Sequence, residues 1–132
     1  MADKERIYTG MLVMGPFGDH ESALYLMNTE TFRLPSEPLI KTLMEDKYFH
    51  DELTVRYWVS DVPLTKDQLI ENTVRQQLGD SEIKYYSHYS ELTGYLWTDE
   101  EFNVGGHDLK SELRSFLGKH LYMEITYHER KS

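Results

Sequence analysis

The stretch that decides the fold is Ile83–Leu117, which reads IKYYSHYSELTGYLWTDEEFNVGGHDLKSELRSFL. Two aromatic-rich runs come first, Ile83–Tyr89 and Leu92–Thr98, and such residues favour β-strands. Ser90–Glu91 separates them, although this pair is not a favoured two-residue turn and a four-residue loop would serve equally well. We therefore predict two strands joined as a hairpin, with the rest of the chain pairing with them or covering them.

The two faces of this predicted hairpin differ in chemistry. If the loop has an even number of residues, the side chains of both strands fall into one set that faces inward and one set that faces outward. A loop with an odd number of residues would exchange the two faces of one strand relative to the other. The inward set is Ile83, Tyr85, Ser87 and Tyr89 with Leu92, Gly94 and Leu96. The outward set is Lys84, Tyr86 and His88 with Thr93, Tyr95 and Trp97.

The second half of the stretch predicts a turn followed by a helix. Asp99–Glu101 form an acidic turn, and Gly105–Gly106 allow a tight step into a helix that starts near Asp108. The apolar stripe of this helix is Leu109, Leu113, Phe116 and Leu117, and Gly118 ends it.

Four other runs predict strands. Leu53–Ser60 and His120–His128 alternate between two sets of side chains, as strands with two different faces do. Arg6–Met14 and Ala23–Asn28 are also rich in strand-forming residues, and the glycines and proline of Gly15–Asp19 separate them.

Two helices are predicted between these strands. Ser36 is placed to cap the first, with Pro38 in its opening turn and its end near Asp46. Thr65 and Gln68 form a capping box for the second. The apolar face of the second helix is predicted to be Leu69, Ile70, Val74 and Leu78, with Gly79 as its stop.

The resulting order is β-β-α-β-α-β-β-α-β. It predicts an α+β fold with one mixed or mainly antiparallel sheet of about six strands, curled and accompanied by three helices. A length of 132 residues fits a single globular domain over 1–132, with fraying expected at 1–4 and 129–132.

The composition narrows the classes of function. A net charge of −9, from 14 basic and 23 acidic side chains, argues against nucleic-acid binding because an acidic domain repels phosphate backbones. The chain has no cysteine and no apolar run long enough to span a membrane. MADKERIYTG has no apolar core after its charges, so we expect no signal peptide and a cytoplasmic location.

The strongest functional lead is an aromatic and polar sheet face. If the predicted strands are neighbours, both tryptophans lie on one surface beside polar groups, as in many binding sites. The alternative is that helices cover this face and its aromatic residues form a second core layer. The candidate ligand- or partner-binding residues are Trp58, Tyr86, His88, Tyr95, Trp97, Tyr122 and His128.

Other patterns give weaker leads. Asp99–Glu101 with His107 and Asp108 form an acidic group, but their spacing matches no known metal loop, and Asp108 is explained by helix capping. Gly105–Gly106 before a helix could cradle a phosphate, but the acidic residues nearby argue against it. His88 and His128 are the histidine pair to inspect for a shared site. We expect no metal and no cofactor.

We therefore predict a non-enzymatic acidic binding or interaction domain, such as an adaptor, an inhibitor or a regulatory protein. Its partner would be a protein or a small molecule, and self-association through an exposed face or edge strand is a further expectation. The alternatives are a small hydrolase or isomerase with a histidine and carboxylate site on the same face, and a small-molecule sensor.

Overall fold

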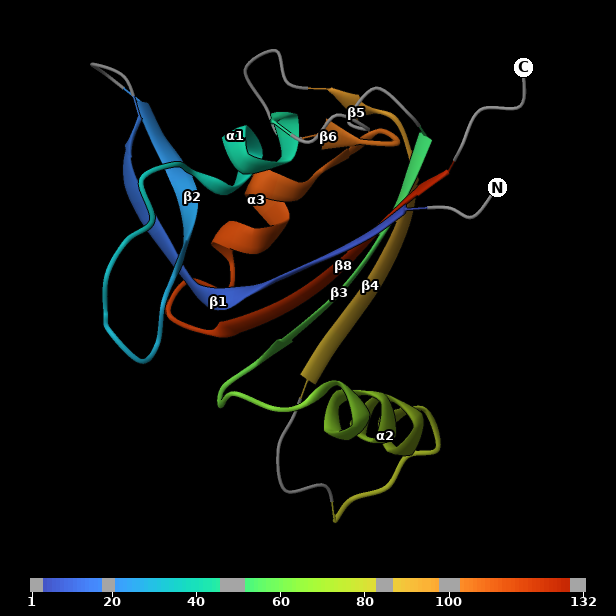
Figure 1. Cartoon of the computed structure of the whole chain (residues 1–132). Helices are drawn as coiled ribbons and strands as arrows, with labels where there is room; N and C mark the ends of the chain where they lie inside the picture. Colours follow the sequence, from blue (N-terminus) through green and yellow to red (C-terminus); the bar gives the residue numbers. More distant parts are fainter. Residues whose placement is uncertain (1–3, 18–20, 46–51, 83–86, 98–102, 129–132) are drawn as a thin grey trace.

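A computed structural model describes residues 4–17, 21–45, 52–82, 87–97 and 103–128, and it confirms the α+β class (Figure 1). The main sheet has five antiparallel strands in the order β2-β1-β8-β3-β4. These strands are β1 (Lys4–Phe17), β2 (Glu21–Met27), β3 (Glu52–Ser60), β4 (Ser87–Gly94) and β8 (His120–His128). A small second sheet contains β5 (Leu96–Trp97), β6 (Asn103–Val104) and β7 (His107–Asp108).

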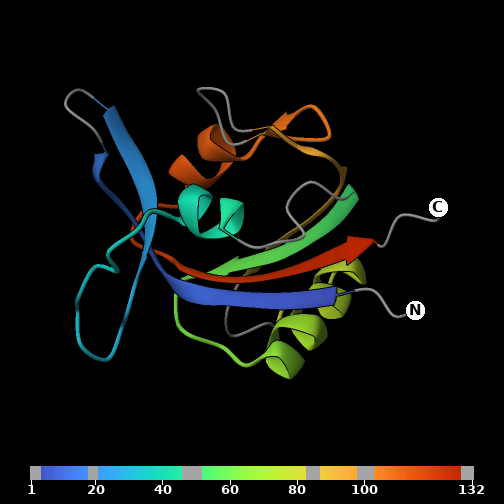
Figure 2. The ribbon, with the colours of Figure 1, turned by 45° about the horizontal axis from the view of Figure 1, so that its top comes forward.

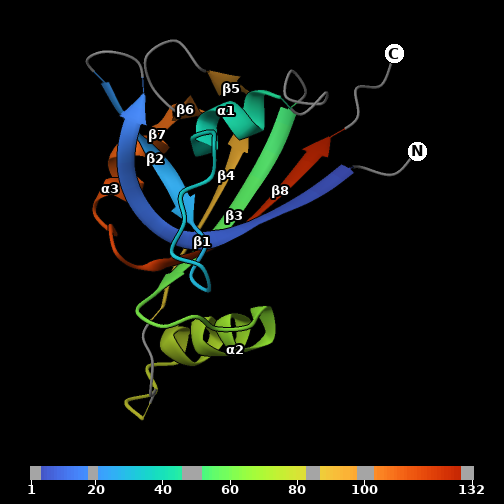
Figure 3. The same cartoon turned by 60° about the vertical axis from the view of Figure 1, so that its left-hand side comes forward.

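The main sheet is curled, as predicted, and helices lie on both of its sides. α1 (Leu39–Met44) and α3 (Leu109–Arg114) lie on its concave side, here called the inner face (Figure 2). α2 (Lys66–Gln77) crosses one end of the opposite side, here called the outer face. Figure 3 shows β1 bending around the helices: its first part pairs with β8 and its second part with β2.

The alternation of β3 and β8 builds the core. Their inner-face residues are almost fully buried and pack against Leu39 and Leu43 of α1 and Leu109 and Leu113 of α3. Full burial of one such side chain contributes about 1.5–3 kcal/mol, so this layer is the main source of stability. The strand members of the layer are Leu53, Val55, Tyr57 and Val59 with Leu121, Met123, Ile125 and Tyr127.

The predicted hairpin at Ser90–Glu91 is wrong. β4 runs through these two residues as one strand, and each residue from Ser87 to Gly94 has a partner on β3. The pairing along β3 outweighs a weak turn signal, since Ser and Glu do not form a favoured turn. As a result, Tyr89 faces outward and His88 inward, the reverse of the prediction. The first part of the predicted hairpin, residues 83–86, lies outside the described residues.

The helix predictions have mixed outcomes. The Thr65–Gln68 capping box of α2 is confirmed, and so is Asp108 as the cap of α3. The cap by Ser36 is wrong, because Pro38 holds the N-cap position of α1 without a side-chain hydrogen bond. The predicted apolar face of α2 is only partly correct, since Leu69 is buried. The other three members are exposed: Ile70 by 41%, Val74 by 48% and Leu78 by 80%.

Substitution of Gly105 tests the contact between the two sheets. Gly105 and Gly106 both have left-handed backbones, with φ of 56° and 86°, but only at Gly105 would a Cβ overlap the carbonyl of Thr93. Gly106→Ala should lower the free energy of unfolding by about 1–2 kcal/mol through backbone strain alone. Gly105→Ala should cost more than about 2 kcal/mol. Equal losses in urea unfolding would contradict the predicted overlap.

Candidate functional site

Three aromatic side chains form a row across the outer face. Trp58 of β3 lies opposite Tyr122 of β8 and Tyr89 of β4, with ring centroids 5.9 Å and 5.0 Å away. α2 crosses this end of the face, and the indole Nε1 of Trp58 donates to Thr73 Oγ1 at 3.2 Å. Trp58 is consequently only 4% exposed. The tryptophan thus belongs to a small second core, with the two tyrosines half-buried at its sides.

A buried carboxylate ties the start of α2 to the next row of this face. Glu124 of β8 is 1% exposed, and Arg56 Nη2 donates to its Oε2 at 2.7 Å. Lys66, the first residue of α2, forms an ion pair with Oε1. Both cations keep 40% of their side chains exposed. A hydrogen bond to Glu124 raises the pKa of the Lys66 amine, against a smaller lowering by desolvation.

The end of α2 is held by a different contact. The side-chain amide of Gln76 bonds both backbone groups of Ser87: the Ser87 N–H donates to Oε1 at 2.9 Å, and Nε2 donates to the Ser87 carbonyl at 2.7 Å. α2 is therefore fixed to the sheet at its start by charge and at its end by a pair of hydrogen bonds. The surface between α2 and the sheet is therefore fixed at both ends of the helix.

A cavity of about 300 Å³ opens where α2 meets β1 and β8. Leu64 and Leu69 give it an apolar part. Its polar side chains come from β1, the segment after β2, the end of β3 and the start of β8. They are Thr9, Asn28, Thr29, Glu30, Ser60, His120 and Tyr122.

Hydrogen bonds within the lining show what this cavity can do. Asn28 Oδ1 accepts from the backbone N–H of Glu30 at 2.8 Å, which fixes the rim on that side. Ser60 lies opposite His120 on the neighbouring strand, but its hydroxyl donates to the Val62 carbonyl at 2.6 Å. A serine nucleophile needs its proton directed to a base. In this geometry the Ser60 hydroxyl proton is directed to a backbone carbonyl and not to His120.

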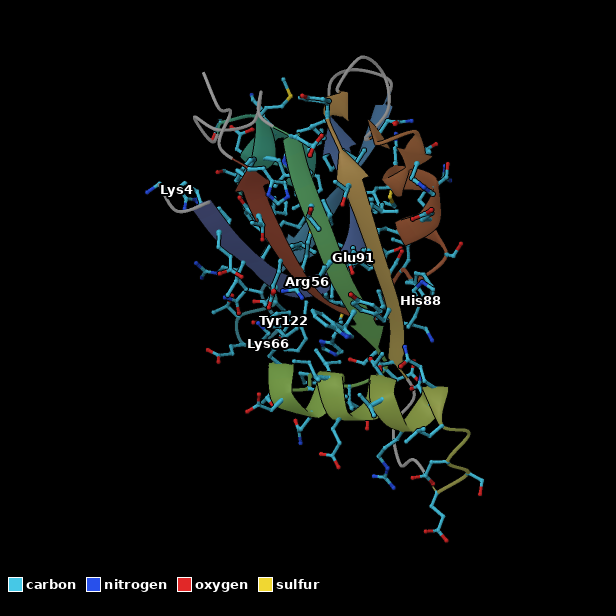
Figure 4. All side chains as sticks on the ribbon, turned by 90° about the vertical axis from the view of Figure 1, so that its right-hand side faces the viewer. Lys4, Arg56, Lys66, His88, Glu91 and Tyr122 are labelled. Carbon is cyan, nitrogen blue, oxygen red and sulfur yellow. The ribbon has the colours of Figure 1, made fainter. Side chains whose placement is uncertain are left out.

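The other end of the outer face carries a row of hydroxyl groups. Thr54 Oγ1 lies 3.1 Å from Thr93 Oγ1 and 2.7 Å from His128 Nε2. α2 lies at the opposite end of the face and does not cover this row (Figure 4). These groups form a polar surface that continues beyond the aromatic row.

The inner face has its own polar group, centred on Glu112 of α3. The buried Tyr57 hydroxyl donates to Glu112 Oε2 at 3.1 Å, and His107 Nδ1 lies 3.6 Å from Oε1. Burial, with a smaller effect from Glu112, raises the pKa of Tyr57 to about 12. The tyrosine is therefore a neutral hydrogen-bond donor at neutral pH. His88 stacks on Phe116 of the α3 region at 4.9 Å.

The structure brings together some of the candidate residues predicted from the sequence. Trp58 and Tyr122 are neighbours on the outer face, and His128 lies on the same face at its other end. His88 is on the inner face, because β4 has no turn. His88 and His128 therefore cannot share a site, and the pairing suggested by the sequence is wrong.

The remaining predicted residues are less informative. Tyr95 is exposed just beyond β4. Tyr86, the side chain of Trp97 and Asp99–Glu101 lie outside the described residues. Within the described ranges, no three His, Asp or Glu side chains gather closely enough to hold a metal ion. Nor does any helix there have the length and apolarity needed to cross a membrane.

Sequence reasoning missed several residues that shape the site. Tyr89 was assigned to the inner face, and Lys66 and Gln76 were not considered as contacts of the sheet. The alternation of His120–His128 puts Glu124 on the same face as Tyr122, but nothing in the sequence indicates that Lys66 would cover it. His120, Ser60 and Glu30 are separated along the chain, and only the strand order brings them to one cavity.

Comparisons with known proteins add no relative: neither protein-family profiles, nor curated proteins, nor solved structures gave a match to this chain.

Replacing Glu124 tests the attachment of α2. Glu124→Gln removes the charge that Arg56 and Lys66 share, and we expect the free energy of unfolding to fall by about 1–3 kcal/mol. Glu5→Gln is the control, since Glu5 is exposed on the same face and should change stability by less than about 0.5 kcal/mol. Urea unfolding measures both, and similar losses would argue against a stabilising role for the buried group.

Tyr57 should make stability depend on alkaline pH. Its folded-state pKa is about 12 against an ordinary value of 10.0, so its contribution is complete below pH 10 and is lost as the pH rises towards 12. The stability difference between the wild type and Tyr57→Phe should shrink by roughly 2–3 kcal/mol over this range. Urea unfolding at several pH values measures it. A constant difference would show that Tyr57 titrates normally.

Proposed function

We propose that this protein is a non-enzymatic binding domain whose ligand is a small polar molecule held in the cavity beside Tyr122. The observation that carries the proposal is the cavity itself, where polar side chains from separate segments converge next to an aromatic ring. Small-molecule sites have this character: a concave space of a few hundred cubic ångströms with an apolar part and a few fixed polar groups.

The rigidity of the surroundings supports this function. Tyr122 is packed against Trp58, and Leu69 belongs to the helix that Lys66 and Gln76 fix to the sheet. A site that is ordered before binding loses less conformational freedom when its ligand arrives. The same rigidity suits a sensor or regulatory domain, in which binding has to be specific without being followed by a reaction.

Charge narrows the choice of partner. The chain carries a net charge of −9, and Glu30 is the acidic member of the cavity lining, whose described residues include no lysine or arginine. Polyanionic ligands would therefore meet repulsion both at a distance and at the site. Neutral or cationic polar molecules fit the lining better.

A small hydrolase is the second candidate, because Ser60, His120 and Glu30 all line the same cavity. These are the residue types of a nucleophile, a base and an orienting carboxylate. The hydroxyl of Ser60 would first have to leave the Val62 carbonyl, to which it donates. Turnover of small esters that disappears in Ser60→Ala and in His120→Gln would establish this candidate in place of the first.

A matched pair of loop variants tests the binding site. Thr29 lines the cavity and Thr31, two residues away, does not. Thr29→Trp should fill part of the space and weaken any ligand roughly tenfold or more, whereas Thr31→Trp should leave binding unchanged. Ligands are first sought among neutral and cationic metabolites by thermal shift and tryptophan fluorescence. Affinities are then measured by calorimetry.

Two results would count against the site. One is a ligand that binds equally well to both variants, since it would lie elsewhere. The other is the absence of any stabilising molecule in a broad panel that includes anions, since a preformed cavity of this size should accept some of them. Binding of anions alone would keep the cavity and remove the preference for neutral or cationic ligands.

A further inference from the structure

β4 is an end strand of the main sheet. It pairs with β3 on one side, and no described strand pairs with its other side. Figure 4 shows it at the edge of the sheet, with α2 crossing below its Ser87 end. Glu91 and Thr93 are exposed there. Within the described part of the chain, no strand occupies the backbone groups on that second side.

The contact of Gln76 shows which residues offer these groups. Both the N–H and the carbonyl of Ser87 are bonded to the Gln76 side chain, so they point away from β3. The direction alternates along a strand, and the pairing of β4 with β3 continues without a bulge. The N–H and carbonyl groups of Tyr89, Glu91 and Thr93 therefore also point away from β3. The Thr93 carbonyl lies against Gly105, so the groups of Tyr89 and Glu91 are the ones left for a further strand. Those of His88, Ser90 and Leu92 face β3.

We infer that β4 pairs with β4 of a second copy of this chain, antiparallel, about a two-fold axis at Ser90. In this register, Tyr89 of each copy lies opposite Glu91 of the other copy, which gives two equivalent residue pairs. Each of these pairs exchanges two backbone hydrogen bonds. About four such bonds would join the two sheets. The Ser87 end is already occupied by Gln76, which limits the contact to the middle of the strand.

The side chains favour this register over the registers obtained by shifting the two-fold axis along β4. A phenol opposite a carboxylate is favourable, and within one chain the Tyr89 hydroxyl already donates to Glu91 Oε2 at 3.0 Å. On the inner face, His88 would lie opposite Leu92, so no like charges meet. Moving the axis to Glu91 would place the two Glu91 carboxylates opposite each other, which is destabilising.

The sequence of this edge lacks the usual protection against pairing. Ser87–Gly94 contains no proline and no lysine, and its register with β3 shows no bulge. Prolines, lysines and bulges are among the features that keep edge strands apart in monomeric proteins, and Glu91 is the carboxylate that this edge carries. The middle of β4 therefore has a pairing side without prolines, lysines or bulges.

The charge of the chain gives the pairing a distinctive salt response. Each copy carries a net charge of −9, so two copies repel each other at low ionic strength. The contact itself consists of backbone hydrogen bonds and neutral side chains apart from Glu91. Added salt should therefore strengthen the dimer. A basic peptide docking on the same acidic protein would show the opposite trend.

Sedimentation velocity from about 10 μM to about 1 mM protein, at about 0.05 M and 0.5 M salt, tests the inference. We expect a reversible dimer that tightens with salt. Glu91→Pro removes an N–H that faces the open side, so it should weaken the dimer roughly tenfold or more with little loss of fold stability. Ser90→Pro is the matched control: its N–H faces β3, so it should destabilise the fold itself.

Amide hydrogen exchange on the unmodified protein gives a second readout that needs no variant. The amides of Tyr89 and Glu91 should become protected as concentration rises, while that of Ser90 is protected throughout. A protein that stays monomeric across the range overturns the inference. So does a dimer that Glu91→Pro leaves intact, since it would use another surface such as the exposed stripe of α2. Pairing seen only with added basic peptides overturns self-pairing as well.

Discussion

The pairing of β3 with β8 at the centre of the sheet is the constraint on which the rest of the structure depends. Its register sets Val55 beside Ile125 on the inner face and Arg56 beside Glu124 on the outer face. Because side chains alternate, a shift of one residue would put the carboxylate in the apolar core. The cost of burying an unpaired charge thus reinforces the register that the hydrophobic core selects.

That register also explains why α2 binds where it does. Glu124 leaves a carboxylate on the outer face that needs cations, and Lys66 at the helix start joins Arg56 in supplying them. With this end and Gln76 both fixed, Thr73 is directed to the indole of Trp58. The apolar side chains of Ile70 and Val74 are then turned outward. Polar contacts, more than the apolar stripe, decide which side of the helix meets the sheet.

The sequence predicts those parts of the fold that depend on local pattern. The alternation of β3 and β8, the capping box at Thr65 and the cap at Asp108 were all found in this way. The hairpin at Ser90–Glu91 was not, because two polar residues fit a solvent-facing strand as well as a loop, and β3 settles the choice. The cavity could not be predicted, since Thr9, Ser60 and His120 meet only through the strand order.

α2 is the element that the proposed cavity and the proposed strand pairing share. Leu69, near its start, lines the cavity, and Gln76, two turns later, occupies the Ser87 end of the β4 edge. A ligand at the proposed cavity would therefore contact the same helix whose other end holds Gln76 on Ser87. The two proposals thus rest on one element, and both depend on the polar contacts that fix α2 to the sheet.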